Sequence, residues 1–354
     1  MEYRLAHKDF ITLADFSRDD LLAILREAER IRRAEASLTT VDILHMYDEA
    51  RALVAAGKRY ESVLNRRAVA LLFSLPSTRT RAAVEWAIVR SGGHPLYFTR
   101  ATTQVSRGES IEDTVKSLEP YSAALVLRTD SHEVLTRAAA AVKIPVINAL
   151  SDLEHPVEVL AEFLTLSRVI ANRPNSPGND SAAEISLDFE SEISFDCFTK
   201  VKCAYIGDGN NNIAKSFAYG AAKLGIDFTI AAPNDYQCPV ELREQLSKTT
   251  VKFTDDPQKA ILNAHAIFSD TYISMGQEAE REKREKAFQS YQVNEALVKN
   301  ADPNYAYFHC LPAYRGKEVT AAIIDGNHSH VFAIAESRLL VYRALFSLLT
   351  QNLT

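Results

Sequence analysis

The chain has 354 residues, of which 47% are hydrophobic and 24% charged, and its formal net charge is −6 at pH 7. This length favours two domains over one. The negative charge argues against a nucleic-acid-binding protein, since binding to phosphate backbones needs a surplus of Lys and Arg. The chain also lacks any run of about 18 apolar residues, so we expect no membrane span.

Short apolar or β-branched runs alternate along the chain with segments of helical periodicity. Uninterrupted apolar strands that alternate with helices are typical of parallel sheets covered on both faces. The sequence therefore predicts an α/β protein with two doubly wound domains, each a parallel sheet flanked by helices, joined by long interdomain helices. The predicted strands are Ala68–Leu75, His94–Thr99, Ala123–Thr129, Ile144–Leu150, Lys202–Asp208, Asp227–Pro233, Ala264–Asp270 and Ala306–Pro312, and the predicted helices include Asp113–Glu119, Pro156–Arg168, Ile213–Leu224 and Glu336–Leu353.

The domain boundary is expected near residue 150, where a long helical segment follows "LSDLEH". We assign residues 1–150, completed by the C-terminal helix 336–354, to the first domain and residues 151–335 to the second. Residues 171–200 are rich in Pro, Asn, Ser and acidic residues, a composition typical of a polar surface loop inserted into a domain.

The expected compartment follows from the N-terminus and the cysteines. The N-terminal sequence has neither the apolar core of a signal peptide nor the acid-free, Arg- and Ser-rich character of a presequence. Cys197, Cys203, Cys238 and Cys310 form no CxxC pair, which favours reduced thiols over a disulfide framework. We therefore expect a cytoplasmic protein, although a mitochondrial matrix protein whose presequence is missing from this chain would look the same.

In a parallel α/β sheet, ligands bind beyond the carboxyl ends of the strands. Ser77–Thr80 follow the first predicted strand and open a helix. Free N–H groups, hydroxyls and a guanidinium at such a position suit a bound phosphate. The alternative is an ordinary helix cap with Arg79 and Arg81 in solvent. Arg128 and His155, which also stand at a strand end and a helix start, favour the anion site.

The segment "YIGDGNNNIAKSF" begins like a dinucleotide-binding motif but does not complete it. Gly207 and Gly209 fill the first two positions of G-x-G-x-x-G, whereas Asn212 stands at the third. No clear acidic partner for a ribose follows the next predicted strand. The asparagines at this helix start are better suited to holding a small carboxylate.

Two further strand ends carry residues that could bind a substrate or react with one. Asp270, in "SDTYISMGQE", comes four residues before the Ser274-Met275 pair begins and can hold an ammonium group; the alternative is an ordinary Asp helix cap. Cys310, in "FHCLPAYRG", is either a buried structural thiol or a thiol beside a substrate amine.

Five motifs together resemble a known family. "STRTR", "LSDLEHPVEVLAEFLTL", "GDGNNN", "DTYISMGQE" and "HCLPAYRG" occur in the order and spacing of ornithine carbamoyltransferases, which belong with the aspartate enzymes to the transcarbamoylases. The resemblance runs from "FITLADFS" to the "AESR" of the last helix, and only Ala171–Lys200 fall outside it. It implies transfer of the carbamoyl group of carbamoyl phosphate to the δ-amine of L-ornithine, which gives L-citrulline and phosphate in arginine metabolism.

The resemblance also implies roles for individual residues. Gln104 matches a residue that reaches the site of a neighbouring subunit, which implies a homotrimer with shared active sites. Neither a metal ion nor a cofactor is implied. The residues implied for carbamoyl phosphate are Ser77, Thr78, Arg79, Thr80, Gln104, Arg128, His155, Glu158, Cys310, Leu311 and Arg338; those implied for L-ornithine are Asn211, Asp270, Ser274 and Met275; and Arg128, His155, Asp270 and Cys310 are the implied catalytic residues.

The sequence departs from the family pattern at two places. Glu158 stands where the family usually has Gln, and Ser74-Leu75 stand where ornithine enzymes generally carry Glu-Lys. An ionised carboxylate can only accept hydrogen bonds and would repel a dianionic substrate. Glu158 is therefore expected to be protonated, paired with an arginine or turned away.

These departures keep two alternatives open beside the ornithine enzyme. One is a carbamoyltransferase for another amine, such as putrescine or lysine. The other is a catalytically weakened relative that acts as a binding or regulatory subunit. The presence of Asn211, Asp270 and Ser274, which provide for both a carboxylate and an ammonium group, favours ornithine.

Overall fold

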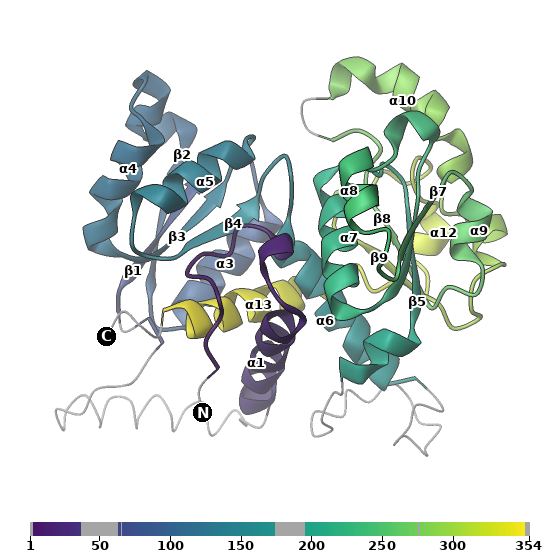
Figure 1. Cartoon of the computed structure of the whole chain (residues 1–354), viewed down its shortest axis with the longest axis horizontal. Coiled ribbons are helices and arrows are strands. Elements are labelled where there is room, and N and C mark those ends of the chain that lie inside the picture. Colours follow the sequence, from purple (N-terminus) through teal and green to yellow (C-terminus); the bar gives the residue numbers. More distant parts are fainter. Residues whose placement is uncertain (1–2, 37–62, 65, 174–194, 275–276, 351–354) are drawn as a thin grey trace.

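The structure is a computed structural model, and it describes residues 3–36, 63–64, 66–173, 195–274 and 277–350. In this part of the chain, two parallel sheets lie side by side, each with helices packed on it (Figure 1). The prediction of an α/β protein with two helix-flanked parallel sheets is therefore confirmed. Among the described residues, no helix has the length and apolar character needed to cross a membrane.

The first sheet has four strands in the order β2-β1-β3-β4, all parallel. The chain runs from β1 to β2 on one side and then returns to place β3 on the other side of β1. The topological switch point, where ligands bind in such sheets, therefore lies between the carboxyl ends of β1 and β3. The strands are β1 Ala68–Phe73, β2 His94–Thr99, β3 Ser122–Arg128 and β4 Val146–Leu150.

The second sheet has five parallel strands in the order β7-β6-β5-β8-β9, and its switch point lies between β5 and β8. One strand, β7, was not predicted from the sequence: it has four residues, includes the exposed Lys252 and pairs with β6 alone at the sheet edge. The strands are β5 Lys202–Ile206, β6 Asp227–Ala231, β7 Val251–Thr254, β8 Ala266–Ser269 and β9 Ala306–His309.

The helices connect successive strands or flank the sheets. The α-helices of the described residues are α1 Arg18–Ala36, α3 Arg79–Arg90, α4 Ile111–Leu118, α5 His132–Ala141, α6 Pro156–Ala171, α7 Asn212–Leu224, α8 Val240–Gln245, α9 Pro257–Ile261, α10 Arg281–Ala287, α11 Glu295–Val298, α12 Ala321–Ile324 and α13 Ile334–Leu349. The 3-10 helices are η1 Leu13–Asp15, η2 Arg100–Thr102, η3 Gln104–Arg107, η4 Glu119–Tyr121, η5 Phe195–Lys200, η6 Asn234–Tyr236, η7 Glu278–Glu280 and η8 Gln289–Tyr291.

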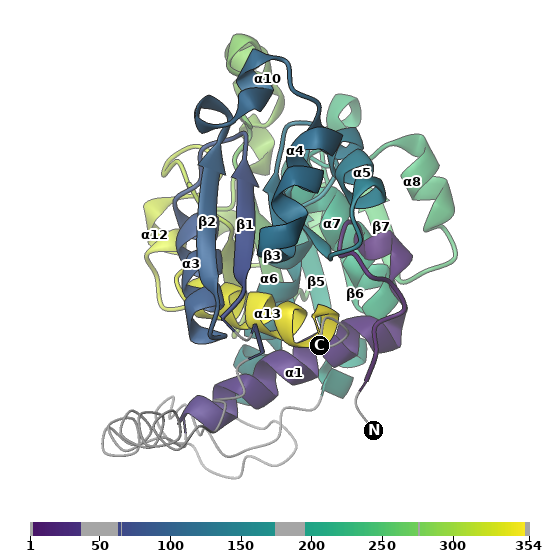
Figure 2. The same ribbon diagram turned by 90° about the vertical axis from the view of Figure 1, so that its left-hand side faces the viewer.

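Two helices, α6 and α13, join the halves of the molecule. α6 is buried over most of its length, the carboxylates of Glu158 and Glu162 included. It packs against α13, α7 and β4, and α13 packs in turn against α1 and α3. Figure 2 shows α13 and α1 running side by side past the lower ends of the first-sheet strands.

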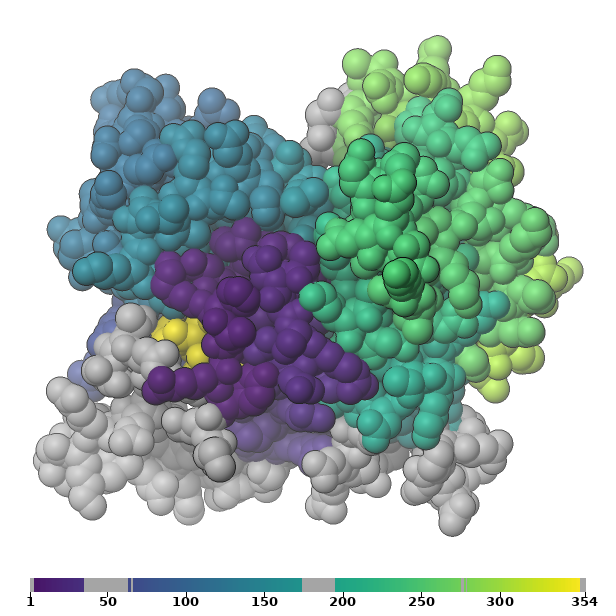
Figure 3. Space-filling model, viewed as in Figure 1, coloured from purple at the N-terminus to yellow at the C-terminus, as the bar shows by residue number. Residues whose placement is uncertain are grey.

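A single hydrophobic cluster runs through both sheets by way of these helices. Phe163 of α6 lies with its ring 5.5 Å from that of Phe217 and 6.5 Å from those of Phe228 and Phe268. The two outer sheet faces have separate, smaller clusters. In the space-filling view the halves diverge above this shared core and leave a notch between them, on the side where α10 lies (Figure 3).

The predicted polar insertion at 171–200 falls mostly outside the described residues, which omit 174–194. Its last residues, Phe195–Lys200, form η5. Phe195 and Phe198 are buried there, and the Phe198 ring lies 6.1 Å from that of Phe163. This end of the segment therefore contributes to the shared core.

Candidate active site

The residues singled out at strand ends gather at the two switch points. Ser77–Thr80 follow β1 and Arg128 ends β3, so they flank the switch point of the first sheet. Asn211 follows β5 and Asp270 follows β8, so they flank that of the second. The fold thus places a cationic, hydroxyl-rich edge in one half and an amide–carboxylate edge in the other.

The Ser77–Thr80 segment enters α3 without an ordinary side-chain cap. Thr78 occupies the N-cap position, yet its side chain makes no capping hydrogen bond. The Arg79 Nη2 atom donates to the main-chain carbonyl of Leu311, from the other half of the molecule. Arg81 lies 3.6 Å above the Tyr97 ring. The helix-cap alternative, in which both arginines lie free in solvent, does not describe this segment.

Arg128 and His155 are both buried beside this segment. Arg128 Nε and His155 Nδ1 have no hydrogen-bond partner in the described structure. Burial lowers the pKa of His155 well below its ordinary value, and the charges of Arg128 and Arg338 lower it further. The imidazole is therefore neutral at neutral pH, and the unpartnered donor of Arg128 is free to bind an anion.

Glu158 is paired with Arg338, which is one of the three arrangements that the sequence allowed. Arg338 Nε donates to Glu158 Oε2 at 2.6 Å, and Nη2 donates to Oε1. Burial alone would lower the pKa of Arg338, but the charge and hydrogen bonds of Glu158 raise it above its ordinary value. His155 Nε2 lies 3.6 Å from Glu158 Oε2. The fork of Arg338 is thus occupied by a side chain of this chain.

Asn211, Asp270 and Cys310 form a hydrogen-bonded chain across the second switch point. Asn211 Oδ1 accepts from the Ala214 N–H at 2.7 Å, so its Nδ2 atom must face Asp270 Oδ2, at 3.1 Å. Cys310 Sγ donates to Asp270 Oδ1 at 3.1 Å. Burial raises the pKa of Asp270, and burial and the nearby Asp270 charge raise that of Cys310 well above its ordinary value. The thiol is therefore neutral at neutral pH and faces the carboxylate.

Asp270 does not cap a helix. A turn follows it, and its Oδ1 atom accepts from the Thr271 N–H at 2.7 Å. The glycine of "GDGNNN" has a packing role: a Cβ atom at Gly209 would lie 3.0 Å from both the Cys238 nitrogen and the Tyr236 carbonyl oxygen. These contacts explain Gly209 without a bound nucleotide, and Gly207 has a φ of 148°, a backbone conformation that favours glycine.

The Leu311 loop is held by a second buried network. The Leu311 N–H donates to His309 Nδ1 at 2.9 Å, and His309 Nε2 lies 3.3 Å from Glu318 Oε1. Leu311 has a φ of 59°, a conformation that costs a non-glycine residue about 1–3 kcal/mol. The strained residue, Leu311, is the one whose carbonyl accepts the hydrogen bond from Arg79.

One group of side chains has metal-binding character. Asp270, His309 and Cys310 each offer a ligand atom, and these atoms lie within 4.8 Å of one another. However, His309 Nδ1 already accepts from Leu311, and Nε2 faces Glu318. The Cys310–Asp270 and Leu311–His309 hydrogen bonds already engage a ligand atom of each residue, and we assign no metal to the group.

Two predicted site residues make no described contact with the others, and a third is not described. Gln104 is exposed on η3, and among the described contacts its side chain makes one hydrogen bond, accepted from Arg107 at 3.4 Å. The Ser274 N–H donates to Gln277 Oε1 at 3.0 Å, and no hydrogen bond joins its hydroxyl to Asp270 among the described contacts. Met275 lies outside the described residues.

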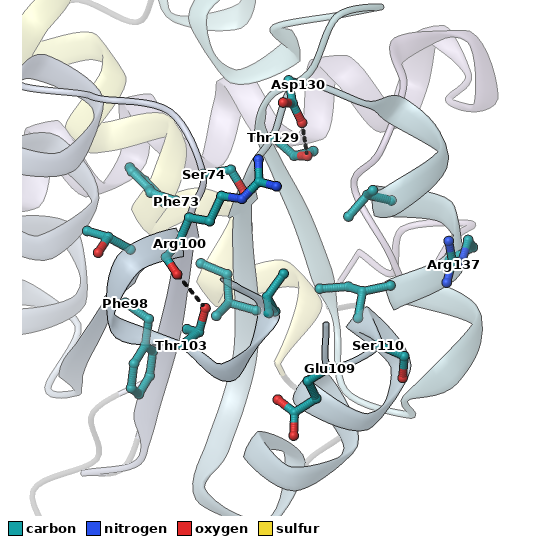
Figure 4. A pocket seen from close by; sticks show the side chains of 15 residues that line it. Phe73, Ser74, Phe98, Arg100, Thr103, Glu109, Ser110, Thr129, Asp130 and Arg137 are labelled. Atoms are coloured by element: carbon teal, nitrogen blue, oxygen red, sulfur yellow. Dashed lines mark hydrogen bonds between the residues drawn. The ribbon is translucent and has the colours of Figure 1, made fainter. Parts of the chain in front are cut away.

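A cavity of about 280 Å³ opens beside the same edge of the first sheet (Figure 4). Its wall includes Ser74, Arg100 and Asp130, which follow β1, β2 and β3. None of the predicted substrate ligands lines it. The cavity therefore adjoins the candidate site and does not contain it.

Some residues of the site network were not identified from the sequence. The Tyr205 hydroxyl accepts from Asn211 Nδ2 at 3.0 Å, and buried Arg284 contacts two of the loops described above. Arg284 lies in the charged run "EAEREKREKAF", which is typical of an exposed helix. The only local signal is its spacing of four residues from Phe288, which places both on one helix face.

The cationic edge, the amide–carboxylate edge and the shared core define a two-sheet α/β protein. A family model described as "Aspartate/ornithine carbamoyltransferase, carbamoyl-P binding domain" matches residues 8–168. The model described as "Aspartate/ornithine carbamoyltransferase, Asp/Orn binding domain" matches residues 199–349. The chain belongs to the aspartate/ornithine carbamoyltransferase family.

Individual relatives agree with this assignment. The ornithine carbamoyltransferase of Bacillus subtilis (strain 168) is 37% identical over 344 residues, which cover 96% of this chain and 92% of the relative. Among solved structures, ornithine carbamoyltransferase from Pyrococcus furiosus superposes with a TM-score of 0.79 at 32% identity and full coverage of both chains. The Thermus thermophilus enzyme gives 0.74 at 30% identity and covers 97% of this chain and 99% of its own.

Proposed function

We propose that this protein is an ornithine carbamoyltransferase, which transfers the carbamoyl group of carbamoyl phosphate to the δ-amine of L-ornithine and releases L-citrulline and phosphate. The observation that carries the proposal is the joining of the two switch points: Arg79 of the cationic edge donates to Leu311 of the edge that holds Asp270 and Cys310. This contact supports a site in which Arg79 binds the phosphate and Asp270 binds the amine of one substrate pair. The names of the relatives support ornithine as the acceptor.

In this proposal the first half, residues 1–150 with 336–354, binds carbamoyl phosphate. Ser77–Thr80 receive the phosphate at the N-terminus of α3, where N–H groups and the helix dipole favour an anion. Arg128, the neutral His155 and the Thr80 hydroxyl stabilise the charge that develops on the carbamoyl oxygen.

The second half, residues 151–335, binds the amino acid. Asn211 holds the α-carboxylate, while Asp270 and Ser274, with Met275, hold the amino groups. The neutral δ-amine attacks the carbamoyl carbon, the bond from that carbon to the phosphate oxygen breaks, and the nitrogen loses a proton to the departing phosphate. Cys310 and the Leu311 carbonyl lie beside the reacting centre. Proximity between two aligned substrates supplies much of the rate.

We further propose a homotrimer in which Gln104 completes the site of a neighbouring subunit, working in the cytoplasm in arginine biosynthesis. The exposure of Gln104 on η3, with a side chain that hydrogen-bonds only Arg107 among the described contacts, supports a role between subunits.

The test is citrulline formation by the purified protein from carbamoyl phosphate and L-ornithine, with putrescine and L-lysine run in parallel. Turnover with ornithine alone would support the proposal. Faster turnover with putrescine or lysine would overturn the choice of acceptor. Absence of turnover with every amine, despite binding of N-phosphonoacetyl-L-ornithine, would overturn the enzymatic function in favour of a binding subunit.

A further inference from the structure

Arg284 of α10 is a buried cation outside the set of predicted substrate ligands. Its side chain is almost fully buried and lies 4.6 Å above the Tyr236 ring and 5.6 Å from that of Phe288. Nε donates to the Tyr272 carbonyl at 2.6 Å, and Nη2 donates to Asp208 Oδ2. A guanidinium with two directed hydrogen bonds fixes the relative position of the groups that it contacts.

Both contacts fall on loops that carry predicted ornithine ligands. Tyr272 lies between Asp270 and Ser274, the two described residues implied for the amino groups. Asp208 lies three residues before Asn211, and its second oxygen, Oδ1, accepts from the Asn210 N–H at 2.9 Å. Arg284 therefore bridges the loop after β5 and the loop after β8 from outside the site.

The aromatic surroundings leave this bridge little freedom. The Tyr272 and Phe288 rings stack at 4.7 Å, and the Tyr236 and Phe288 rings lie 4.9 Å apart. Asp208 is buried as well, so the ion pair is desolvated on both sides, and removal of either partner leaves an uncompensated buried charge. The remaining contact, Nη1 to the exposed Glu280 at 3.5 Å, is peripheral.

We propose that Arg284 is a positioning residue of the acceptor site, which holds the loop of the carboxylate-binding Asn211 and the loop of the ammonium-binding Asp270 and Ser274 in fixed positions. Because these loops anchor the amino-acid end of the acceptor, Arg284 sets how far the terminal amine reaches and thereby selects the length of the diamino acid that is carbamoylated. The inference rests on the proposed function, because it assumes that these three residues bind the acceptor.

The first test compares steady-state kinetics of Arg284→Met, Arg284→Lys and Asp208→Asn with the unchanged protein. We expect Arg284→Met to raise KM for L-ornithine about tenfold, with KM for carbamoyl phosphate unchanged. We also expect the preference for L-ornithine over L-lysine, which is one methylene longer, to fall about tenfold. Arg284→Lys, which keeps the charge, should recover part of both effects, and Asp208→Asn should reproduce them with α10 unaltered.

Arg281→Met is the matched control. Arg281 lies on the same helix, is largely exposed and contacts Glu285 at 3.7 Å, so its kinetics should match those of the unchanged protein. A parallel rise of both KM values, or a constant ornithine-to-lysine preference in all Arg284 and Asp208 variants, would overturn the positioning role and leave a merely structural one.

A binding measurement separates this inference from the proposed function. Calorimetry with N-phosphonoacetyl-L-ornithine should show about tenfold weaker binding to Arg284→Met, whereas phosphonoacetamide, which lacks the amino-acid portion, should bind both proteins equally. This comparison needs no turnover, so it tests the positioning role of Arg284 even if the unchanged protein forms no citrulline. Equal binding of the ornithine derivative to both proteins would overturn the inference.

Discussion

At the residue scale, the pairing of Glu158 with Arg338 changes which cations remain for a phosphate. Arg338 comes from α13 and Glu158 from the first turn of α6, and their two hydrogen bonds use the guanidinium fork. The neighbouring Arg128 keeps an unpartnered Nε atom. We therefore expect Arg128 and the Ser77–Thr80 segment to donate hydrogen bonds to carbamoyl phosphate. Arg338 is held by Glu158 and has fewer donors to offer.

Glu158→Gln should release Arg338 and remove a negative charge beside a dianionic substrate. We expect KM for carbamoyl phosphate to fall about tenfold, the value of one charge-assisted hydrogen bond. The thermal midpoint should fall as well, because a buried guanidinium then lacks its counter-ion. Kinetics with carbamoyl phosphate as the varied substrate and thermal unfolding measure the two effects.

Glu336→Gln provides the control for that substitution. Glu336 lies on α13 near Arg338, but its side chain is 61% exposed and pairs with Arg168 at 3.3 Å, so neither quantity should change. If Glu158→Gln left KM for carbamoyl phosphate as it was, then Glu158 does not perturb the site.

Arg128→Met should abolish most of the activity. Its guanidinium is the buried donor at the switch point of the first sheet, and loss of one donor to a developing oxyanion typically lowers kcat by about 10²–10³. Arg137→Met, which removes an exposed arginine paired with Glu112 at 2.7 Å, should retain full kcat. Equal kcat in the two variants would contradict the role of Arg128; circular dichroism checks that both fold.

At the element scale, Glu154 ties the N-terminal segment to the loop that leads into α6. Its carboxylate accepts from the Leu13 N–H at 3.1 Å and from the Thr12 hydroxyl. Burial raises the pKa of Glu154 to about 7. The folded protein therefore holds this proton more tightly than the unfolded chain, so the free energy of unfolding decreases as pH rises between the unfolded and folded pKa values.

Glu154→Gln should remove this pH dependence. Each pKa unit corresponds to about 1.4 kcal/mol, so the shift from 4.5 to about 7 amounts to roughly 3 kcal/mol of lost stability at most. The unchanged protein should lose thermal stability relative to the variant as pH rises from about 5 to 8. Calorimetric scans across this range measure the difference, and parallel curves for the two proteins would exclude Glu154 as the titrating group.

The sequence alone was sufficient to predict those helices and strands that have a strong local signal. The apolar run that became β1 and the Pro at the start of α6 predicted those elements to within a few residues. Strand β7 escaped prediction because an edge strand needs only one apolar face, and "VKFT" is too short to display one. The placement of Asn211 and Asp270 at one switch point followed from their position after parallel strands.

Contacts between distant elements could not be predicted in the same way. The partner of Glu158 comes from α13, 180 residues later, and Arg79 meets Leu311 across 232 residues. Nothing in the spacing of either sequence segment specifies such a pair, because it depends on how α6, α13 and the second sheet pack together. The burial of Arg284 within a charged segment has the same origin.

At the scale of the whole molecule, the central question is whether all residues of one active site come from the same chain. Gln104 is exposed on η3, whereas Arg128 lies buried at the end of β3. If Gln104 serves a neighbouring subunit, a site needs Arg128 from one chain and Gln104 from another. Variants that lack one or the other should then be able to complement each other within a mixed trimer.

We therefore predict that Gln104→Ala and Arg128→Met are each nearly inactive alone but regain activity when they are unfolded together and refolded as a mixture. In randomly assembled trimers, half of the sites have an intact Arg128 and half of their neighbours an intact Gln104, so about a quarter of the unchanged activity should return. Light scattering after size-exclusion chromatography should give the mass of three chains for every sample. No recovery in mixed trimers, or full activity in a monomer, would mean that each chain holds a complete site and that Gln104 serves its own subunit.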